Sequence, residues 1–257
     1  MLAVERHRLI CEMLDKNGTV SISELNERLD VSVETIRRDF LELERQGRLR
    51  RIHGGAVSLG NIKKMGTRLS RMSEFSEEKA ELSEFACSLI SEGDLIAIDS
   101  GSTGIKFSES LVKNFKELTV ITNSLDNFEV LKQNPGIKII LAGGIYDEAE
   151  NTFYGHTTIE MIKSYHVSKC FIFPYAVSLR YGISGYGGYM ADIQRAYIEI
   201  SDKTIVLADS DKIEKNAFEK LCDIERSFTY VTDSKISDLI VSEYSEYGID
   251  LIKEKRK

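Results

Sequence analysis

Four short polar clusters contain the side chains best suited to binding a small anionic molecule. They are DSGSTG (residues 99–104), TNS (122–124), GG (143–144) and DSDK (209–212). Glycine lets the backbone approach a ligand closely, hydroxyls donate hydrogen bonds, and a helix starting within the first cluster would present its positive N-terminus. Lys212 would add the full positive charge that a phosphate attracts, and Asp99 and Asp209 could accept hydrogen bonds from sugar hydroxyls. The first cluster therefore predicts a phosphate cradle.

Each cluster also has a plainer interpretation. A glycine-serine segment after a strand is usually only a turn, TNS is an ordinary start of a loop, and Lys212 alone would be a surface lysine. The carboxylates of Asp99, Asp209 and Asp211 would stand near the expected phosphate. Whether they face the sugar or turn outward stays open from the sequence.

The elements that must hold these clusters are alternating strands and helices. Six apolar segments between residues 94 and 233 have the length of strands: DLIAID, LTVITN, IKIILAGG, KCFIFP, KTIVLAD and FTYVTD. Helical patterns cover residues 77–91, 104–114, 125–133 and 191–202. This alternation predicts an α/β domain with a Rossmann-like parallel sheet, whose ligands bind beyond the carboxyl ends of the strands. All four clusters fall at such ends, which favours one shared anionic small-molecule site.

The positive charge of this acidic chain is gathered near its N-terminus. The net charge is −7, yet residues 45–73 contain eight Lys and Arg and no Asp or Glu. A basic block on an acidic protein attracts a polyanion locally. A solvated linker is the alternative for the whole block, although the arginines of residues 45–51 lie too close to a structured segment for that interpretation to cover them.

The first 57 residues have the pattern of a winged helix-turn-helix. Ser21-x-x-Glu24 predicts a capping box, and Ser32 caps a further helix after a very short turn. On that helix Val33, Ile36, Phe40 and Leu43 share one face, Thr35 and Arg38 lie on the opposite face, and Arg37 lies on the flank. RLRRIHGGAV (residues 48–57) predicts a basic hairpin that would serve as a wing. Duplex DNA is favoured over RNA because there is no aromatic platform on which bases could stack.

Residues 5–57 resemble the N-terminal domain of DeoR-family bacterial transcriptional regulators. The resemblance is carried by the pattern VSxxTIRRDxxxLxxxGxLxRxHGGA. It implies that Ser32, Thr35, Arg37 and Arg38 belong to the DNA-reading helix and that Arg51 and His53 belong to the wing. The basic hairpin adds Arg50 to these expected DNA contacts.

Residues 76–233 resemble the sensor domain of the same family, which is similar in fold to ribose-5-phosphate isomerase and the CoA-transferases. In that family a phosphorylated sugar or related metabolite binds the sensor domain and alters DNA affinity. The motifs DSGST, TNS, LAGG and ADSDK imply effector contacts from Ser100, Gly101, Ser102, Thr103, Asn123, Gly143, Gly144 and Lys212. The clusters themselves add Asp99 and Ser124.

The chain departs from the family pattern at three places. Ile145-Tyr146-Asp147 stands where an arginine usually follows the double glycine, and FIFPYA (residues 171–176) stands where the strand end usually contains glycine. Met190-Ala191…Gln194-Arg195 replaces a Glu-Ala…Lys-Arg pattern. These changes bear on which ligand fits. The glycine-rich residues 181–190 fit a mobile lid and an ordinary connection equally well.

The two halves together predict a two-domain transcription factor. We expect a winged helix-turn-helix at residues 1–57, a basic linker at 58–75 and an effector-sensing α/β domain at 76–257. The expected function is repression of a carbohydrate-metabolism operon, with operator DNA and a phosphorylated sugar as partners. A homo-oligomer, dimer or tetramer, would place two recognition helices on neighbouring half-sites.

Other classes of protein are less well supported. A sugar-phosphate isomerase or CoA-transferase with a DNA-binding appendage would need a glutamate at a strand end, where only aspartates occur. A nucleoid-binding protein without sequence preference stays possible. The cysteines and histidines have no metal-ligand spacing, so we expect no metal, cofactor or catalytic residue. With no secretory signal and no apolar run long enough to span a bilayer, the expected location is the cytoplasm.

Overall fold

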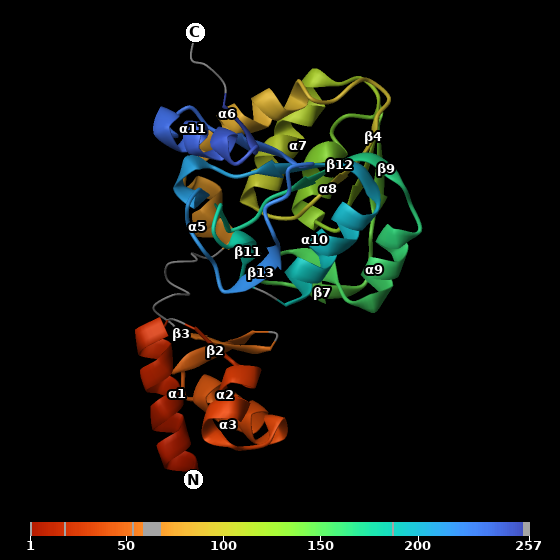
Figure 1. The fold of residues 1–257 in the computed structure, drawn as a ribbon. Helices are drawn as coiled ribbons and strands as arrows, with labels where there is room; N and C mark the ends of the chain where they lie inside the picture. Colours follow the sequence, from red (N-terminus) through yellow and green to blue (C-terminus); the bar gives the residue numbers. More distant parts are fainter. Residues whose placement is uncertain (1, 18, 53, 59–67, 187, 254–257) are drawn as a thin grey trace.

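The first three helices begin and end at the residues that the sequence marks for them. The computed structural model describes residues 2–17, 19–52, 54–58, 68–186 and 188–253, and its N-terminal part contains α1 (Ala3–Asn17), α2 (Ile22–Leu29) and α3 (Val33–Arg45) (Figure 1). The Ser21 hydroxyl accepts a hydrogen bond from the Glu24 amide over 3.0 Å, and the Ser32 hydroxyl accepts one from the Thr35 amide over 3.2 Å. Both bonds satisfy amide groups that have no partner within the helix.

A small buried core holds these helices against a three-stranded sheet. Ile36, Phe40 and Leu43 of α3 are buried in it, whereas Val33 is 39% exposed because it begins the helix beyond the edge of the core. Placing Val33 on the buried face was therefore wrong. The sheet contains the expected hairpin of β2 (Leu49–Ile52) and β3 (Gly55–Ser58), and adds β1 (Thr19–Ser21) on the other side of β3.

The larger part of the chain is built on one parallel sheet. Its order is β15-β14-β12-β9-β4-β5-β6, and every neighbouring pair is parallel. The strands are β4 (Leu95–Ile98), β5 (Leu118–Thr122), β6 (Ile137–Leu141), β9 (Val167–Ile172), β12 (Ser201–Leu207), β14 (Thr229–Thr232) and β15 (Asp250–Lys253). The fold class expected from the sequence is confirmed by this sheet and by the helix-turn-helix before it.

Helices cover both faces of the sheet (Figure 1). One buried cluster includes Leu82 of α6 (Ser76–Cys87), Phe107 of α7 (Ser102–Asn114) and Leu131 of α8 (Leu125–Leu131). The other includes side chains of α9 (His156–Lys163), α10 (Tyr189–Glu199) and α11 (Asp238–Glu246). Because strand side chains alternate in direction, Ile96 joins the first cluster and Ala97 the second.

Helix α5 (Arg68–Ser73) lies within the residues expected to be a basic linker. Arg68 forms an ion pair of 2.5 Å with Asp126, and Arg71 forms one of 2.5 Å with Glu150. Both arginines are thus neutralised by acids of the sheet domain. The basic block at residues 45–73 therefore includes two arginines that pair within the protein, which sequence charge alone does not reveal because their partners lie far along the chain.

Two small antiparallel sheets lie beside the parallel one and were not expected. β7 (Ile145–Asp147) pairs with β8 (Thr152–Tyr154). β10 (Ala176–Ser178), β11 (Gly182–Gly185) and β13 (Glu219–Cys222) form the second, in the order β10-β11-β13. The glycine-rich residues 181–190 therefore contain a paired strand and the start of α10. A single 3₁₀ turn, η1 (Ser210–Lys212), follows β12.

Candidate functional site

Helix α3 presents an exposed polar surface at its N-terminal end. The side chains of Arg37 and Arg38 are exposed, Arg38 to 79%, and each lies within 4.0 Å of the Glu34 carboxylate. Ser32 and Thr35 share a hydrogen bond of 2.9 Å between their hydroxyls. Exposed ion pairs of this length are weak, so both arginine side chains can change partners at little cost.

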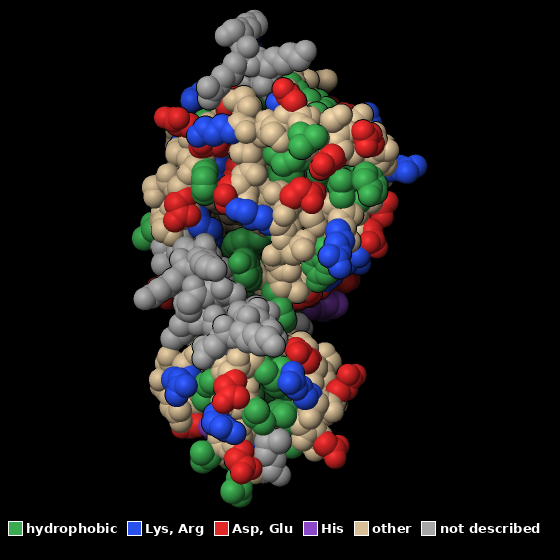
Figure 2. All heavy atoms as spheres, turned by 60° about the vertical axis from the view of Figure 1, so that its left-hand side comes forward, with side chains coloured by type: hydrophobic (Ala, Val, Ile, Leu, Met, Phe, Trp, Pro, Cys, Tyr) green, Lys and Arg blue, Asp and Glu red, His purple; other side chains and the backbone are tan. Residues whose placement is uncertain are grey.

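The wing is connected to α3 by Arg51. Its amide and its guanidinium donate to the two carboxylate oxygens of Glu44 over 2.8 and 2.6 Å. Arg50 belongs to β2, but its side chain lies outside the described part of the structure, as does the whole of His53. On the face of the molecule seen in Figure 2, the basic side chains of the N-terminal domain are interspersed with acidic ones.

Beneath this surface, the buried carboxylate of Asp39 fixes α1 to α3. It accepts hydrogen bonds from Arg6 over 2.7 and 2.9 Å and lies 3.0 Å from the His7 ring nitrogen. The sequence analysis gave Asp39 no role. Its contacts are internal, so it supports α3 from the side opposite the exposed arginines.

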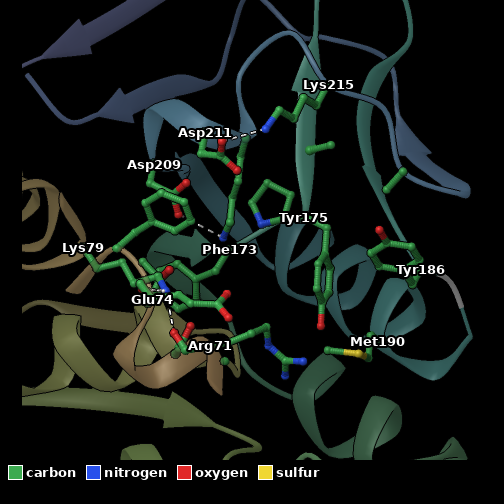
Figure 3. A pocket seen from close by; sticks show the side chains of 18 of the residues that line it. Arg71, Glu74, Lys79, Phe173, Tyr175, Tyr186, Met190, Asp209, Asp211 and Lys215 are labelled. Atoms are coloured by element: carbon green, nitrogen blue, oxygen red, sulfur yellow. Dashed lines mark hydrogen bonds and ion pairs between the residues drawn. The ribbon is translucent and has the colours of Figure 1, made fainter. Parts of the chain in front are cut away.

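The sheet domain contains a cavity of about 620 Å³ at the carboxyl ends of its strands (Figure 3). Ser100, Gly101, Ser102 and Thr103 line it, between the end of β4 and the first turn of α7. Gly101 has φ +119°, a conformation that side-chain-bearing residues rarely adopt. The amino end of α7 thereby opens into the cavity and offers the partial positive charge of a helix N-terminus.

Basic groups surround the same cavity. Lys212 and Lys79 both line it, and Lys79 is only 3% exposed. The Lys79 ammonium donates to the carbonyls of Arg71 and Glu74, each over 2.6 Å. Burial, and secondarily the charge of Lys212, lowers the pKa of Lys79 to about 8. An anion bound nearby would favour the charged form of Lys79 and would be attracted by its ammonium group.

Two buried polar groups of the cavity wall accept no hydrogen bond from any described residue. They are the Thr103 hydroxyl and both carboxylate oxygens of Asp209, whose residue is 1% exposed. The Lys212 ammonium lies 3.5 Å from one Asp209 oxygen. Buried polar groups are normally satisfied, so these atoms are available for hydrogen bonds to a molecule in the cavity.

Asp99 lies behind the cavity wall and shapes it. Its carboxylate accepts from the Gln194 amide over 2.6 Å, from the Ser100 amide over 2.7 Å and from the Phe173 amide over 3.3 Å. Burial raises the pKa of Asp99 to about 6, against the opposing effect of these hydrogen bonds. Its contacts hold the loops after β4 and β9 together.

Asn123 and Ser124 are packed into the protein away from the cavity lining. The Asn123 amide donates to Thr152 and to the Phe153 carbonyl, each over 2.8 Å, and its oxygen accepts from the Tyr197 hydroxyl over 3.1 Å. Ser124 caps α8.

The double glycine is also placed apart from the lining residues. Gly143 has open space where a Cβ would stand, whereas a Cβ on Gly144 would lie 2.1 Å from the Thr158 hydroxyl. Of the expected effector residues, the structure brings Ser100, Gly101, Ser102, Thr103 and Lys212 to the cavity.

Several cavity residues were missed by the sequence analysis. Arg71 was assigned to the linker, Lys79 had the appearance of a solvated helix residue, and the aromatic residues Tyr175 and Tyr186 were noted only within unusual motifs. Sequence offered one signal, the FIFPYA departure at the end of β9. Within the described residues, no cluster of His, Cys, Asp and Glu is suited to a metal ion. None of the helices described is long and apolar enough to cross a membrane.

Two family models match the chain. One, described as the DeoR-like helix-turn-helix domain, matches residues 6–61, and the other, described as the DeoR C terminal sensor domain, matches residues 74–234. Together these matches include α3 and most of the residues that line the cavity.

Curated relatives match over nearly their whole length. The HTH-type transcriptional regulator GolR of Listeria innocua is 30% identical over 97% of this chain and 98% of its own. The lactose phosphotransferase system repressor of Lactococcus lactis is 34% identical over 93% and 94%, and the L-fucose operon activator of Haemophilus influenzae is 30% identical over 91% and 93%. Among solved structures, ribose 5-phosphate isomerase A of Neisseria gonorrhoeae matches 52% of each chain at 19% identity with a TM-score of 0.40.

Proposed function

This chain belongs to the DeoR family of transcriptional regulators, and from that premise we propose that it represses a carbohydrate-metabolism operon under the control of a phosphorylated sugar. The sugar phosphate binds in the cavity at the strand ends and changes operator affinity. Membership of this family shows that the chain is a DNA-binding transcriptional regulator with a sensor domain. The relatives reported above are named as regulators, which sets aside the isomerase and CoA-transferase alternatives.

The observation that carries the effector proposal is the pairing of unsatisfied acceptors with cations. Asp209 can accept hydrogen bonds from sugar hydroxyls, and the Thr103 hydroxyl can donate to them or accept from them. Lys79, Lys212 and the amino end of α7 supply positive charge for a phosphate. A free sugar would bring no negative charge to the cations, and inorganic phosphate would bring a single hydroxyl where a sugar brings several. A phosphorylated sugar satisfies both.

The names of two relatives support a carbohydrate operon. One is a lactose phosphotransferase system repressor and another an L-fucose operon activator. We infer that this chain also controls sugar use, and we expect it to repress its operon and not to activate it.

Operator reading is assigned to α3 and to the wing. In this proposal Thr35 and Arg38 contact base edges, Ser32 and Arg37 contact base edges or phosphates at the amino end of the helix, and Arg50, Arg51 and His53 contact the backbone. One small domain makes few base contacts, so we propose a homo-oligomer that sets two α3 helices on adjacent half-sites. Sedimentation of the full chain with and without operator tests this last point.

The decisive experiment begins with selection of an operator from a random duplex DNA pool. Operator affinity is then measured with increasing concentrations of hexose and pentose phosphates, and with the same sugars lacking phosphate. We expect a phosphorylated sugar to shift the affinity and its unphosphorylated form to have no effect. Lys212→Ala should lose the response and keep operator binding.

Lys203→Ala is the matched control, since Lys203 is exposed at the opposite end of β12 from the cavity. A retained response at unchanged sugar concentration in Lys212→Ala would remove Lys212 from the site. Recovery of DNA without any common motif would contradict the regulator proposal itself.

A further inference from the structure

The cavity has two chemically different sides. The polar side consists of Ser100–Thr103, Lys79, Asp209 and Lys212, as described above. Tyr175, Tyr186 and Met190 line the other side, and these three residues are called the aromatic wall below (Figure 3). Neither the phosphate nor the hydroxyls of a sugar phosphate account for an aromatic wall.

The aromatic wall comes from two segments that meet across the cavity. Tyr175 follows β9 in the FIFPYA segment, while Tyr186 and Met190 lie between β11 and the first turn of α10. The rings of Tyr175 and Tyr186 meet edge to face, with centroids 5.0 Å apart and planes at 82°. This arrangement is a favourable one for two aromatic rings and fixes the orientation of Tyr175.

The Tyr175 ring has neighbours from both sides of the cavity. Figure 3 shows this ring almost edge-on, with Tyr186 on one side of it and Phe173 and Asp209 on the other. The Arg71 guanidinium lies over the Tyr175 ring, 5.6 Å from the ring centroid, and forms an ion pair with Glu150. The three residues of the wall are partly exposed, in contrast to the fully buried Phe171 and Tyr197 of the core. The wall therefore faces the cavity and does not belong to the packing of the sheet.

A ring-form sugar has a surface that matches such a wall. The C–H groups on one side of a pyranose ring form an apolar and weakly positive face, which packs on the electron-rich face of an aromatic ring. The hydroxyls around the ring edge remain free to donate hydrogen bonds. An open-chain polyol has no comparable flat face and must also give up more rotational freedom when it binds.

We propose that the aromatic wall selects the cyclic form of the sugar phosphate, by stacking the pyranose ring on Tyr175 while the phosphate occupies the amino end of α7. Tyr175 is the specificity-determining residue, and Tyr186 positions its ring. This inference rests on the proposed function, because it assumes that a sugar phosphate fills the cavity.

The test compares each cyclic sugar phosphate with its reduced, open-chain alditol phosphate. Glucose 6-phosphate and sorbitol 6-phosphate share the carbon chain and the phosphate, but the second cannot form a ring. Binding of both to the full chain is measured by calorimetry, together with the corresponding pair from mannose and mannitol. We expect the ring form to bind about tenfold more tightly than the open chain in at least one pair.

Variants of Tyr175 and Tyr186 test whether the aromatic wall causes the preference for the cyclic ligand. Tyr175→Leu keeps an apolar side chain but removes the ring, and should abolish the preference by weakening only the cyclic ligand. Tyr175→Phe should retain it, and Tyr247→Ala, an exposed tyrosine after α11, is the matched control. Tyr186→Leu should reduce the preference in the same direction, which keeps the test valid if Tyr175→Leu fails to fold.

The outcomes separate the two proposals. Equal binding of ring and open-chain phosphates by the unaltered protein overturns the selection of the cyclic form and leaves the proposed function standing. A preference that survives in both leucine variants also overturns it. If no sugar phosphate binds at all, the proposed function fails and the ring selection fails with it.

Discussion

The Gln194 side-chain amide donates to the Asp99 carboxylate over 2.6 Å and so joins α10 to the loop that forms the cavity floor. Gln194 is one of the positions where the chain departs from the family pattern, which usually has a lysine there. A neutral amide in this place leaves the buried carboxylate without a paired charge from α10. The raised pKa of Asp99, about 6, is consistent with that environment.

The first prediction concerns the pH dependence of stability. Because the pKa of Asp99 is raised from 3.8 to about 6 on folding, the folded protein binds a proton more tightly than the unfolded chain. Asp99 therefore makes its full contribution to the free energy of unfolding below pH 3.8. This contribution, about 3 kcal/mol at most, is lost as the pH rises through 6. Urea denaturation between pH 4 and 7 should show Asp99→Asn gaining stability relative to the unaltered protein over that interval. In a protein that carries Gln194→Lys, the stability gained through Asp99→Asn should be smaller, because the lysine ammonium favours the charged form of the Asp99 carboxylate.

The second prediction concerns the pH dependence of effector binding. The pKa of Lys79 is lowered to about 8, so the free protein loses this charge above pH 8, whereas a bound phosphate favours its retention. Sugar-phosphate affinity should consequently fall above pH 8, by up to about tenfold per pH unit. The phosphate itself is dianionic throughout this range and does not contribute. Calorimetric titrations from pH 7 to 9.5 measure the effect, and an equally steep decline in Lys79→Met would contradict the assignment.

The third prediction concerns the recognition helix. Arg38→Ala should weaken operator binding by about 1–3 kcal/mol while leaving sugar-phosphate binding unchanged. Since the side chain is 79% exposed and only weakly paired with Glu34, stability should change by less than about 0.5 kcal/mol. Fluorescence anisotropy with labelled operator is the measurement. Arg8→Ala, on the exposed surface of α1, provides the control for loss of one positive charge.

The fourth prediction separates packing from ligand contact at the double glycine. A methyl group on Gly144 would meet the Thr158 hydroxyl at 2.1 Å and the Tyr154 carbonyl at 2.6 Å, whereas Gly143 has open space. Gly144→Ala should therefore cost about 1–3 kcal/mol of stability, and Gly143→Ala should cost little. Chemical denaturation of both variants checks this. Unchanged stability with lost effector binding in Gly144→Ala would instead support the expected ligand contact.

Local signals in the sequence predicted most of the architecture. Capping serines located α2 and α3, and short apolar runs located the strands of the parallel sheet, because both signals depend only on neighbouring residues. The cluster at 99–103 was also found in this way, since a strand, a glycine and a helix start follow one another there.

The remaining site residues depend on contacts between distant segments. Arg71 reaches the cavity because α5 folds back on the sheet domain and pairs with Glu150, and nothing near Arg71 in sequence indicates that partner. Asn123 has the residue type of a ligand contact, yet the β8 strand supplies its partners Thr152 and Phe153. The β7–β8 hairpin was itself not expected, so the burial of Asn123 could not have been foreseen.

Helix α5 has a consequence for how effector and DNA-binding domain communicate. It begins directly after residues 59–67, which join the two domains, and it ends at the cavity, where Arg71, Glu74 and Phe75 contribute to the lining. The matched sensor region starts only at residue 74, so a fragment cut at that boundary would lack Arg71 and with it part of the cavity wall. Because Arg71 belongs both to this helix and to the cavity wall, a molecule in the cavity would touch the same short helix that follows the connection to the N-terminal domain. By thermodynamic reciprocity, any effect of such a molecule on DNA affinity would be matched by an equal effect of DNA on its binding.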